Sequence, residues 1–589
     1  MERTHSCNAL RAADCGKTVT LCGWVKRRRT LGNLIFVDIR DRDGITQIVF
    51  DPGECEAAHD AAKDIRSEYV ISVTGTVRSR GDQVNKDLPT GEIEVLASSL
   101  KIFNSAETPP FHLDNEDPTD DLRLRYRYLD LRRAHLQKAL GLRHKVALAV
   151  RNCLDSLGFW EIETPVLSKS TPEGARDYLV PSRVHHGKFY ALPQSPQLLK
   201  QLLMVAGMDK YFQITRCFRD EDLRAERQPE FTQIDLEMSF AEKEDVFSVG
   251  EAVMKTAFET AGYSIETPFP HMTWQDAMDG YGSDKPDLRF GMVIVNVTDI
   301  FKDCAFPPFA SALQEKGSIR CIKVEGGASF PRRRLDELNE VAKKEKAKGI
   351  FYVKYEAEGR KSPVKGLTDE EWAALEKQMS PAEGDLLILS AGPALTACKG
   401  LGAVRLQLGQ ELKLIPENTF AFTWITDFPL FQYSEEEGRW VSEHHPFTSP
   451  NALDIDILEK DPGHVRSNSY DLVINGYEVG SGSVRIHDPQ LQDRIFRLLQ
   501  LKPEQIEDRF GFFINALKYG APPHAGVAFG LDRLTMLLTG RNNIRDVIAF
   551  PKTLKATDLM SEAPSTVSAE QLEELAVAVT RTEEEENQE

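Results

Sequence analysis

Five short runs of alternating apolar and polar residues fill the N-terminal part of the chain, and they constrain its fold more than any other feature. The runs are Thr18–Val25, Asn33–Asp41, Gly44–Phe50, Tyr69–Arg80 and Gly91–Phe103. A period of two is typical of half-buried strands, and Gly, Asp or Pro residues separate the runs. Five such strands in succession predict a small barrel with a buried interior.

The position of a helix narrows this prediction. One helix-like stretch, Glu54–Arg66, lies between the third and fourth runs. Five strands with a helix after the third follow the order of an OB-fold, so residues 1–106 are predicted to form an OB-fold barrel. Another small β-barrel remains the alternative.

The charge of the first strands differs from that of the whole chain. The 589 residues include 72 Lys and Arg against 91 Asp and Glu, a formal net charge of -19. Residues 1–50 hold nine Lys and Arg against five Asp and Glu, a net of +4. So acidic a chain cannot coat nucleic acids generally, and any polyanion must bind a local basic face.

A basic tetrad marks such a face. Lys26–Arg29 follow the first strand-like run, and Trp24 and Phe36 lie on adjoining runs. Cations for phosphates beside aromatic faces for bases are typical of surfaces that bind single-stranded nucleic acid. A solvated turn is the alternative for the tetrad alone.

Several protein classes are excluded by what the sequence lacks. No apolar run reaches the ~18 residues of a membrane span, and the N-terminus has no secretory apolar core. The nine cysteines are scattered without a CxxC pair, which argues against a zinc ribbon or a disulfide framework. Reduced thiols in a cytoplasmic protein are favoured. Neither a P-loop nor a GxGxxG motif occurs.

Beyond the barrel, the pattern of helical and β-rich runs indicates an α+β multidomain protein. The expected divisions are a Pro- and Asp-rich hinge with a basic run (107–135), the first part of a core domain (136–285), an inserted α+β domain (286–415), the second part of the core domain (416–565), and a C-terminal helix with an acidic tail (566–589).

A charged hairpin is predicted over Cys217–Glu237, where two strand-like halves flank a loop. Arg219 and Glu221 are placed on the first half. On the second half four residues alternate and so share one face: Phe231, Gln233, Asp235 and Glu237. Arginine can grip a phosphate with two hydrogen bonds, and phenylalanine offers a plate for a purine. A surface hairpin with ion pairs is the alternative.

Two further segments accompany the hairpin. In Gly526–Leu538 a strand runs into an amphipathic helix, with Asp532 and Arg533 at the junction; an N-capped helix with a surface arginine is the alternative. In Gly158–Leu167 a helix ends and a strand enters Pro165, and proline suits an edge or interface strand.

Taken in order, these segments resemble the three signature motifs of the class II aminoacyl-tRNA synthetases. Pro165 matches motif one, Arg219 to Asp235 motif two, and Gly526 to Arg533 motif three. Four more runs resemble the bacterial aspartate-specific members: Thr171–Arg183, Ala191–Leu203, His444–Pro450 and Ser481–Asp488. The insertion resembles the GAD domain of that type, and the resemblance covers the chain except its acidic tail.

The resemblance implies a fold and an assembly. The expected fold is an antiparallel sheet with flanking helices, an N-terminal OB-fold that binds the anticodon, and the inserted GAD-type domain. A homodimer would form through the motif-one region around Pro165. The implied ligands are L-aspartate, ATP, Mg²⁺ and tRNA(Asp), with tRNA(Asn) as an additional candidate; no membrane or DNA partner is expected.

The resemblance also implies which residues hold these ligands. Aspartate would be bound by Glu173, Gln197, Lys200, Arg219, Asp235, His444 and Arg485. ATP would be bound by Arg219, Glu221, Gln228, Phe231, Glu478, Gly530, Leu531, Asp532 and Arg533. Among them, Arg219, Glu478 and Arg533 are the implied catalytic residues. Mg²⁺ would be held by Asp471 and Glu478, because hard cations favour carboxylate oxygens.

Specificity for aspartate would come from cations. By resemblance, Lys200 and Arg485 grip the side-chain carboxylate, with His444 on a closing loop. The ammonium end would be bound by Glu173, Gln197 and Asp235. An uncharged substrate would leave the buried cations unpaired, which is energetically unfavourable. One departure is visible, since a third glycine is expected where Ser481 stands.

The anticodon contacts map onto the barrel. They are Arg29, Phe36, Gln47, Asn85 and Glu94. Phe36 would stack on a base, with ordinary barrel packing as the alternative. Two further positions concern the choice between tRNA(Asp) and tRNA(Asn): Leu31 is typical of strict discrimination and Gly81 of relaxed charging, so both outcomes stay open.

Two other functions compete. An asparaginyl- or lysyl-tRNA synthetase shares the OB-fold and the motifs, but the long insertion and the context of Arg485 argue against it. A non-catalytic, synthetase-like RNA-binding protein would usually have lost Arg219, Glu478 or Arg533, and all three are present.

Overall fold

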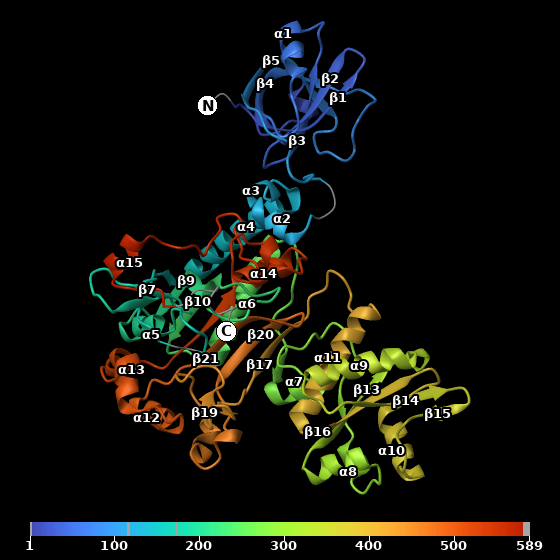
Figure 1. Ribbon diagram of the computed structural model, residues 1–589, viewed down its shortest axis with the longest axis vertical. Coiled ribbons are helices and arrows are strands. Elements are labelled where there is room, and N and C mark those ends of the chain that lie inside the picture. Colours follow the sequence, from blue (N-terminus) through green and yellow to red (C-terminus); the bar gives the residue numbers. More distant parts are fainter. Residues whose placement is uncertain (1–2, 115–117, 172–173, 581–589) are drawn as a thin grey trace. The chain divides into compact units, whose positions relative to one another are not determined.

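The computed structural model describes residues 3–114, 118–171 and 174–580 (Figure 1). The chain divides into two compact units. The first comprises residues 1–141 and 545–565, and the second residues 142–544 and 566–589. Within the described ranges, no helix is long and apolar enough to cross a lipid bilayer.

A closed five-stranded barrel occupies the N-terminal part of the first unit, in the order β1-β2-β3-β5-β4. Its strands are β1 (Thr18–Leu31), β2 (Leu34–Arg40), β3 (Ile45–Phe50), β4 (Val70–Ser79) and β5 (Ile93–Asn104). The helix α1 (Glu56–Ala62) follows the third strand, so the OB-fold prediction is confirmed. Alternate residues of β2, such as Ile35 and Val37, are buried in the barrel interior.

The structure corrects the prediction for the basic tetrad. The first strand does not end at Val25 but continues to Leu31, with Arg28 opposite Val37 and Arg29 opposite Phe36 of β2. The tetrad therefore lies on a barrel strand rather than in a turn. Apolar residues stop alternating after Val25 because the rest of β1 does not face the buried interior of the barrel, although its backbone continues to pair with β2.

The hinge after the barrel is helical and is held by a buried arginine. Its elements are α2 (Asp120–Arg125), α3 (Arg127–Asp130) and the start of α4 (Ala134–Ser156). The guanidinium of Arg127 donates to the backbone carbonyls of Arg545, Ile548 and Ala549. The first unit therefore includes the segment that follows motif three.

An eight-stranded sheet forms the core of the second unit, in the order β11-β17-β20-β21-β22-β10-β9-β6. Its strands are β6 (Trp160–Glu161), β9 (Lys210–Phe218), β10 (Glu230–Ser239), β11 (His271–Thr273), β17 (Phe422–Thr426), β20 (Ser469–Ile474), β21 (Tyr477–Val484) and β22 (His524–Gly530). All neighbours are antiparallel except the two edge pairs, β11 with β17 and β6 with β9. This is the predicted antiparallel sheet.

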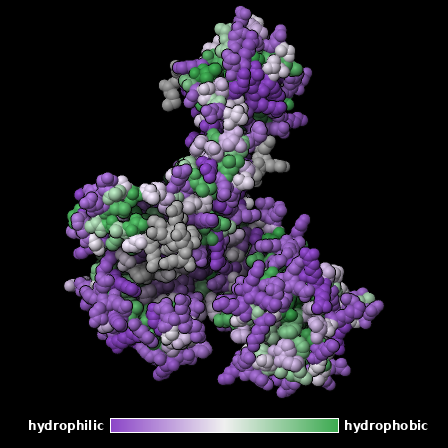
Figure 2. Space-filling view, in the orientation of Figure 1, coloured by the Kyte–Doolittle hydropathy of each residue, from purple (hydrophilic) through white to green (hydrophobic). Residues whose placement is uncertain are grey.

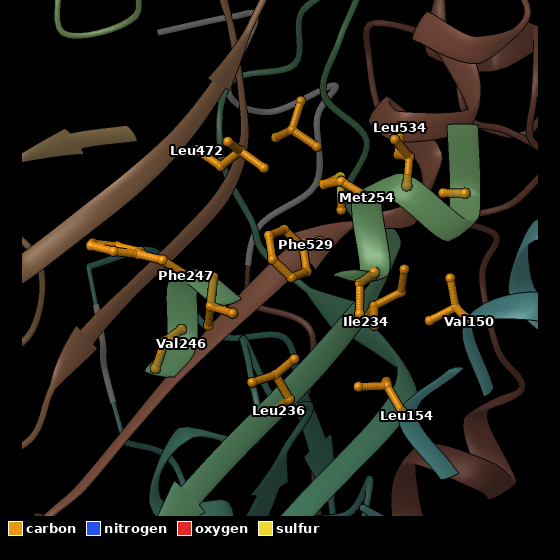
Figure 3. Packing of buried hydrophobic residues seen from close by; sticks show 14 of the residues in the cluster. Val150, Leu154, Ile234, Leu236, Val246, Phe247, Met254, Leu472, Phe529 and Leu534 are labelled. Carbon is orange, nitrogen blue, oxygen red and sulfur yellow. The ribbon is translucent and has the colours of Figure 1, made fainter. Parts of the chain in front are cut away.

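One face of this sheet is covered by helices. Residues of α4, α6 (Lys243–Thr260) and α14 (Leu531–Leu538) pack on strand residues such as Ile234, Leu236 and Phe529 (Figure 3). Because strand residues alternate between faces, the residues between these lie on the opposite face. That open face carries the polar residues described below.

The motif-two hairpin is part of the eight-stranded sheet and its second strand is mostly buried, which overturns the surface-hairpin alternative. The strands β9 and β10 pair along their length inside the sheet. However, β9 ends at Phe218, so Arg219 and Glu221 lie in the connecting loop and not on the strand as predicted. The backbone N–H of Arg219 still donates to the carbonyl oxygen of Pro229 at 2.8 Å, so the pairing of the two strands ends at this bond and the charged loop follows it.

The inserted region has a sheet of its own, in the order β12-β13-β16-β14-β15. Its elements are β12 (Val295–Asn296), α8 (Pro307–Gln314), β13 (Ser318–Val324), α9 (Arg332–Lys344), β14 (Ile350–Glu356), β15 (Gly359–Lys361), α10 (Asp369–Met379), β16 (Leu386–Gly392) and α11 (Ala394–Glu411). The helices α8 and α10 share one apolar cluster with the sheet, and α9 and α11 share another. Helices therefore cover both faces.

The remaining elements connect these parts. They are β7 (Leu179–Pro181), β8 (Phe189–Ala191), α5 (Gln197–Val205), α7 (Trp274–Tyr281), β18 (Phe431–Ser434), β19 (Arg439–Ser442), α12 (Pro489–Leu498), α13 (Pro503–Leu517) and α15 (Ala569–Leu575). Short 3₁₀ turns occur at Ala12–Asp14, Thr298–Phe301, Gly327–Ser329, Ala452–Ile457, Pro462–His464 and Ile544–Asp546. The predicted acidic tail lies outside the described residues apart from its first helix.

Candidate active site

A cavity of about 390 Å³ opens on the face of the eight-stranded sheet opposite α4, α6 and α14. Most residues that the sequence nominates for aspartate and ATP line it: Gln197, Lys200, Arg219, Glu221, Gln228, Phe231, Asp235, His444, Glu478, Arg485, Gly530, Asp532 and Arg533. Leu531 instead lies in the apolar core behind the sheet, and Glu173 lies outside the described residues. Segments far apart in sequence thus meet in one site.

The floor of the cavity is made of closely packed backbone. A Cβ on Gly480 would lie 2.3 Å from the ring of Phe529, and one on Gly482 would lie 2.2 Å from the carbonyl oxygen of Gly526. Only glycine fits these two positions. Between them, Ser481 points to the other side of β21 and lines the cavity.

Four buried charges form a cluster at one end of the cavity. The Lys200 Nζ lies 2.6 Å from Asp235 Oδ1 and 3.3 Å from Glu237 Oε2. The Arg485 guanidinium donates to both oxygens of Glu237, at 2.8 and 3.0 Å. Burial opposes ionisation of Glu237, but the charges of Arg485 and Lys200 outweigh it and lower the pKa of this carboxyl to about 2.

Two polar atoms at this end of the cavity lack hydrogen-bond partners. The Oδ2 of Asp235 and the side-chain nitrogen of Gln197 are buried without a hydrogen bond. Burial raises the pKa of Asp235, against the opposing charge of Lys200. Unpaired buried polar atoms destabilise a fold. The acceptor on Asp235 and the donor on Gln197 would both be satisfied by a ligand that carries a positive and a negative group.

The two adjacent histidines differ in their contacts. The ring of His444 packs edge-on against Phe428, and its Nε2 lies 3.8 Å from Asp471 Oδ1. His445 instead accepts a hydrogen bond at Nε2 from Arg485, at 2.9 Å. Burial and the charge of Arg485 hold the pKa of His445 well below its usual value. A neutral His445 therefore orients Arg485 without adding charge.

An arginine and an aromatic ring face each other at the motif-two end. The Arg219 guanidinium carbon lies 5.1 Å from the centre of the Phe231 ring, and Glu221 pairs with Arg227 at 2.9 Å. On the motif-three side, Arg533 donates to the backbone carbonyl of Glu478. These groups give this end of the cavity a flat apolar plate with cations beside it.

Asp532 has a structural role that the sequence did not indicate. The first residue of α14 is preceded by Gly530 as its cap, and no side chain caps the helix. Asp532 accepts a hydrogen bond from the backbone N–H of Thr232 at 2.7 Å and pairs with Arg143 of α4. The capping alternative is therefore wrong, and Asp532 instead ties motif three to motif two.

Two carboxylates lie together on β20 and β21. Asp471 Oδ1 is buried without a hydrogen-bond partner. Burial, with the nearby charge of Asp471, raises the pKa of Glu478. Such a pair is stabilised by a cation, and oxygen donors with an unused buried acceptor fit Mg²⁺. Within the described part of the chain, no group of three or more potential ligands gathers, so phosphate or water oxygens would complete the shell.

In the barrel, four of the nominated residues form one connected group. Arg29 donates to Gln47 Oε1 at 2.6 Å, and Gln47 donates to Glu94 Oε2 at 2.7 Å. Arg78, which the sequence did not nominate, completes the chain by donating to Glu94 at 2.8 Å. The Arg29 guanidinium lies 5.8 Å from the centre of the Phe36 ring.

Phe36 faces outward. Its neighbours Ile35 and Val37 are buried in the barrel core, whereas Phe36 is half-buried and belongs to no core cluster. Ordinary barrel packing is therefore wrong for this ring.

The other three nominated barrel residues, Leu31, Gly81 and Asn85, lie outside this connected group. Leu31 is 73% exposed at the end of β1, and Gly81 has a positive φ of 57° with open space around it. Asn85 accepts the backbone N–H of Asp87 within its own loop.

Two residues at this end of the cavity were given no ligand role from the sequence. The period of two places Glu237 on the same face as Asp235, but the resemblance assigns it no contact. His445 adjoins His444, and nothing in the sequence distinguishes the two.

Comparison with known proteins follows the same division. Residues 119–554 match the family model of class II tRNA synthetases (D, K and N), and residues 19–103 match that of the OB-fold nucleic acid binding domain. The aspartate–tRNA ligase of Agathobacter rectalis is 52% identical and covers 100% of this chain and 99% of its own length. The aspartate–tRNA(Asp/Asn) ligase of Halothermothrix orenii is 50% identical, covering 98% and 99%.

Solved structures share the fold at lower identity. The asparaginyl-tRNA synthetase of Pyrococcus horikoshii with asparaginyl-adenylate has a TM-score of 0.59 at 19% identity, covering 94% of this chain and 99% of that chain. The aspartyl-tRNA synthetase of Entamoeba histolytica has a TM-score of 0.55 at 20% identity, covering 92% and 89%.

Proposed function

The chain belongs to the aspartate–tRNA ligase family of class II aminoacyl-tRNA synthetases, and on this premise we propose that its cavity activates L-aspartate with ATP and passes the aspartyl group to tRNA. The observation that carries the proposal is the buried cluster of Lys200, Asp235, Glu237 and Arg485 at one end of the cavity.

Aspartate fits this end by charge. Its ammonium group would donate to the unpaired Oδ2 of Asp235. Its carboxylates would accept from Gln197, Lys200 and Arg485, with His444 on a closing loop and Glu173 assigned to the ammonium end. Binding requires Arg485 to share its donors between Glu237 and the ligand, because Glu237 occupies two of them. Asparagine lacks the negative charge that would compensate this second cation.

ATP fits the other end. Phe231 would stack on adenine, and Glu221, Gln228, Gly530 and Asp532 would surround the nucleotide, whereas Leu531 packs in the core behind them. Arg219 would hold the α-phosphate and Arg533 the γ-phosphate. The aspartate α-carboxylate then attacks the α-phosphorus and releases pyrophosphate, after which the 3′-terminal hydroxyl of tRNA attacks the aspartyl-adenylate. Positioning and charge neutralisation supply the catalysis, without an enzyme nucleophile.

Mg²⁺ would be held by Asp471 and Glu478. When bound, it neutralises phosphate charge. The paired carboxylates and the unused oxygen of Asp471 support this assignment.

The barrel would bind the tRNA anticodon. Phe36 offers an outward aromatic face, while Arg29, Gln47 and Glu94 present a connected row of donors and acceptors to base edges. Asn85 would contribute from its loop. We place the protein in the cytoplasm, where its RNA and nucleotide substrates are, and we propose residues 286–415 as its GAD domain.

A homodimer would form around Pro165. Nearby Trp160, Val166 and Leu167 are 65%, 46% and 53% exposed. Most of the visible surface is hydrophilic, but a hydrophobic patch lies over β7 and α15 (Figure 2). Exposed apolar patches mark protein interfaces.

Amino-acid-dependent exchange of pyrophosphate into ATP tests the function. Exchange with aspartate, and little with asparagine or lysine, is expected. Exchange with asparagine or lysine but none with aspartate would overturn the assignment.

Charging of tRNA(Asn) is a separate question. Relatives named for tRNA(Asp) alone and for both RNAs match this chain about equally, and Leu31 and Gly81 point in opposite directions. Aspartylation of the two purified tRNAs measures the choice directly.

A further inference from the structure

A buried arginine of the inserted domain contacts no carboxylate and holds a loop instead. Arg405, on α11, is 2% exposed. Its guanidinium donates to the carbonyl oxygens of Asp287, Phe290, Gly291 and Met292, at distances between 2.8 and 3.1 Å. Burial lowers its pKa to about 10. In the described part of the chain, it belongs to no salt bridge.

The loop is also packed tightly against α11. The guanidinium carbon of Arg405 lies 3.9 Å from the centre of the Phe290 ring and 4.9 Å from that of Tyr281. A Cβ on Gly409 would lie 2.6 Å from the same Phe290 ring. Residues 283–292 are therefore fixed to the inserted domain at their far end.

The middle of the loop, at Asp287, abuts the turn between β20 and β21. A Cβ on Gly476 would lie 3.3 Å from the Cβ of Asp287. Gly476 and Asn475, with φ of 84° and 55°, form the turn that joins β20 to β21. Glu478 follows this turn by two residues, so the loop supports the turn directly beside it.

An ion pair inside the loop braces Asp287. Asp287 accepts hydrogen bonds from the side chain of Arg289 at 2.9 and 2.6 Å. The residue that contacts the β20–β21 turn is thus held both by Arg289 and, through its carbonyl oxygen, by Arg405.

We propose that Arg405 is a positioning residue for ATP: it fixes the loop 283–292, which through Asp287 supports the β20–β21 turn and so places Glu478. The proposal rests on the function proposed above and gives the inserted domain a part in nucleotide binding. The aspartate end should be insensitive, because Arg485 lies at the opposite end of the same strand segment, beyond Val484.

Arg405→Met tests the proposal by ATP binding rather than by turnover. In calorimetry with Mg²⁺ present, the variant should bind ATP about tenfold more weakly, while its Kd for aspartate stays within about twofold. Hydrogen exchange of residues 470–480 should become faster. Arg405→Lys, which retains one donor group, should fall between the two proteins.

Arg360→Met is the matched control. Arg360 also stacks on an aromatic ring of the inserted domain, 4.7 Å from the centre of Trp372, but it contacts no residue of the loop. It should leave ATP affinity and the exchange of residues 470–480 unchanged.

Arg289→Met keeps the proposal testable should Arg405→Met fold poorly, because it acts on the same loop from a partly exposed position. Arg289→Met should also weaken the binding of ATP while leaving the binding of aspartate unchanged. Equal losses for ATP and aspartate, or unchanged ATP affinity in folded Arg405→Met, would overturn the proposal. Absence of aspartate-dependent exchange in the wild type would instead count against the function, while ATP binding still reports on Arg405.

Discussion

Arg485 and Glu237 form a two-fold hydrogen-bonded ion pair although 248 residues separate them in the chain. Both side chains are almost completely buried, at 2% and 0% exposure. The pair joins the end of β21 to β10, and Lys200 lies 3.3 Å from the same carboxylate. A residue expected to bind substrate thus also holds the sheet together.

Arg485→Leu should abolish aspartate activation and also destabilise the protein by about 3–5 kcal/mol, because it leaves Glu237 buried without its partner. The double variant Glu237→Leu with Arg485→Leu should recover much of that stability but none of the activity. Urea unfolding and pyrophosphate exchange measure the two effects. An active single variant would remove Arg485 from the proposed site.

Glu237 should make the free energy of unfolding depend on pH in the acidic range. Its pKa is lowered to about 2 from an ordinary value of 4.5, so its stabilising effect is present above pH 4.5 and is lost as the pH falls towards 2. The difference in unfolding free energy between the wild type and Glu237→Gln should shrink by up to about 3 kcal/mol over that range. A difference that does not change with pH would contradict the assignment.

Gln47→Ala should reduce tRNA aminoacylation by about tenfold or more, because it breaks the row from Arg29 to Glu94 and removes a base contact. Pyrophosphate exchange should be unchanged. Ser98→Ala, which removes a hydroxyl bonded to Thr74 in the same barrel, is the control. Equal losses in both assays would mean that Gln47 serves only the fold.

Trp160→Glu should weaken self-association by about 30-fold or more, since buried aromatic residues dominate interfaces. Sedimentation velocity across a concentration series measures it. Leu453→Glu, at a residue 82% exposed in another part of the unit, is the control. A wild-type protein that is monomeric throughout would refute the proposed dimer.

Gly480→Ala should destabilise the protein by about 1–3 kcal/mol, because its methyl group would overlap Phe529. Ser481→Ala, on the other side of the same strand, should change stability by less than about 0.5 kcal/mol. Thermal unfolding of both variants checks this, and a tolerated Gly480→Ala would mean that the floor can relax.

Much of the fold could be predicted because period-two alternation reports which strand face is buried. It failed where backbone pairing continues without that pattern, as along Lys26–Arg29, and where a strand stops before its polar residues do, as at Arg219. Apolar alternation records burial and not hydrogen bonding, so strand ends were the uncertain part.

The site residues were predicted from the resemblance of local motifs to those of the class II synthetases, and most of those residues do line one cavity. What local motifs could not give is the partner of each charge. The pairing of Glu237 with Arg485, and the contact of His445 rather than His444 with that arginine, depend on strands that meet only in the folded sheet.

The glycine-rich floor also bears on inhibitor design. An adenylate mimic bound over β21 would contact backbone atoms. A larger residue at Gly480 or Gly482 would overlap neighbouring strands, so it would destabilise the sheet rather than only weaken inhibitor binding. Among residues 480–482, resistance substitutions are therefore expected only at Ser481, whose side chain faces the cavity.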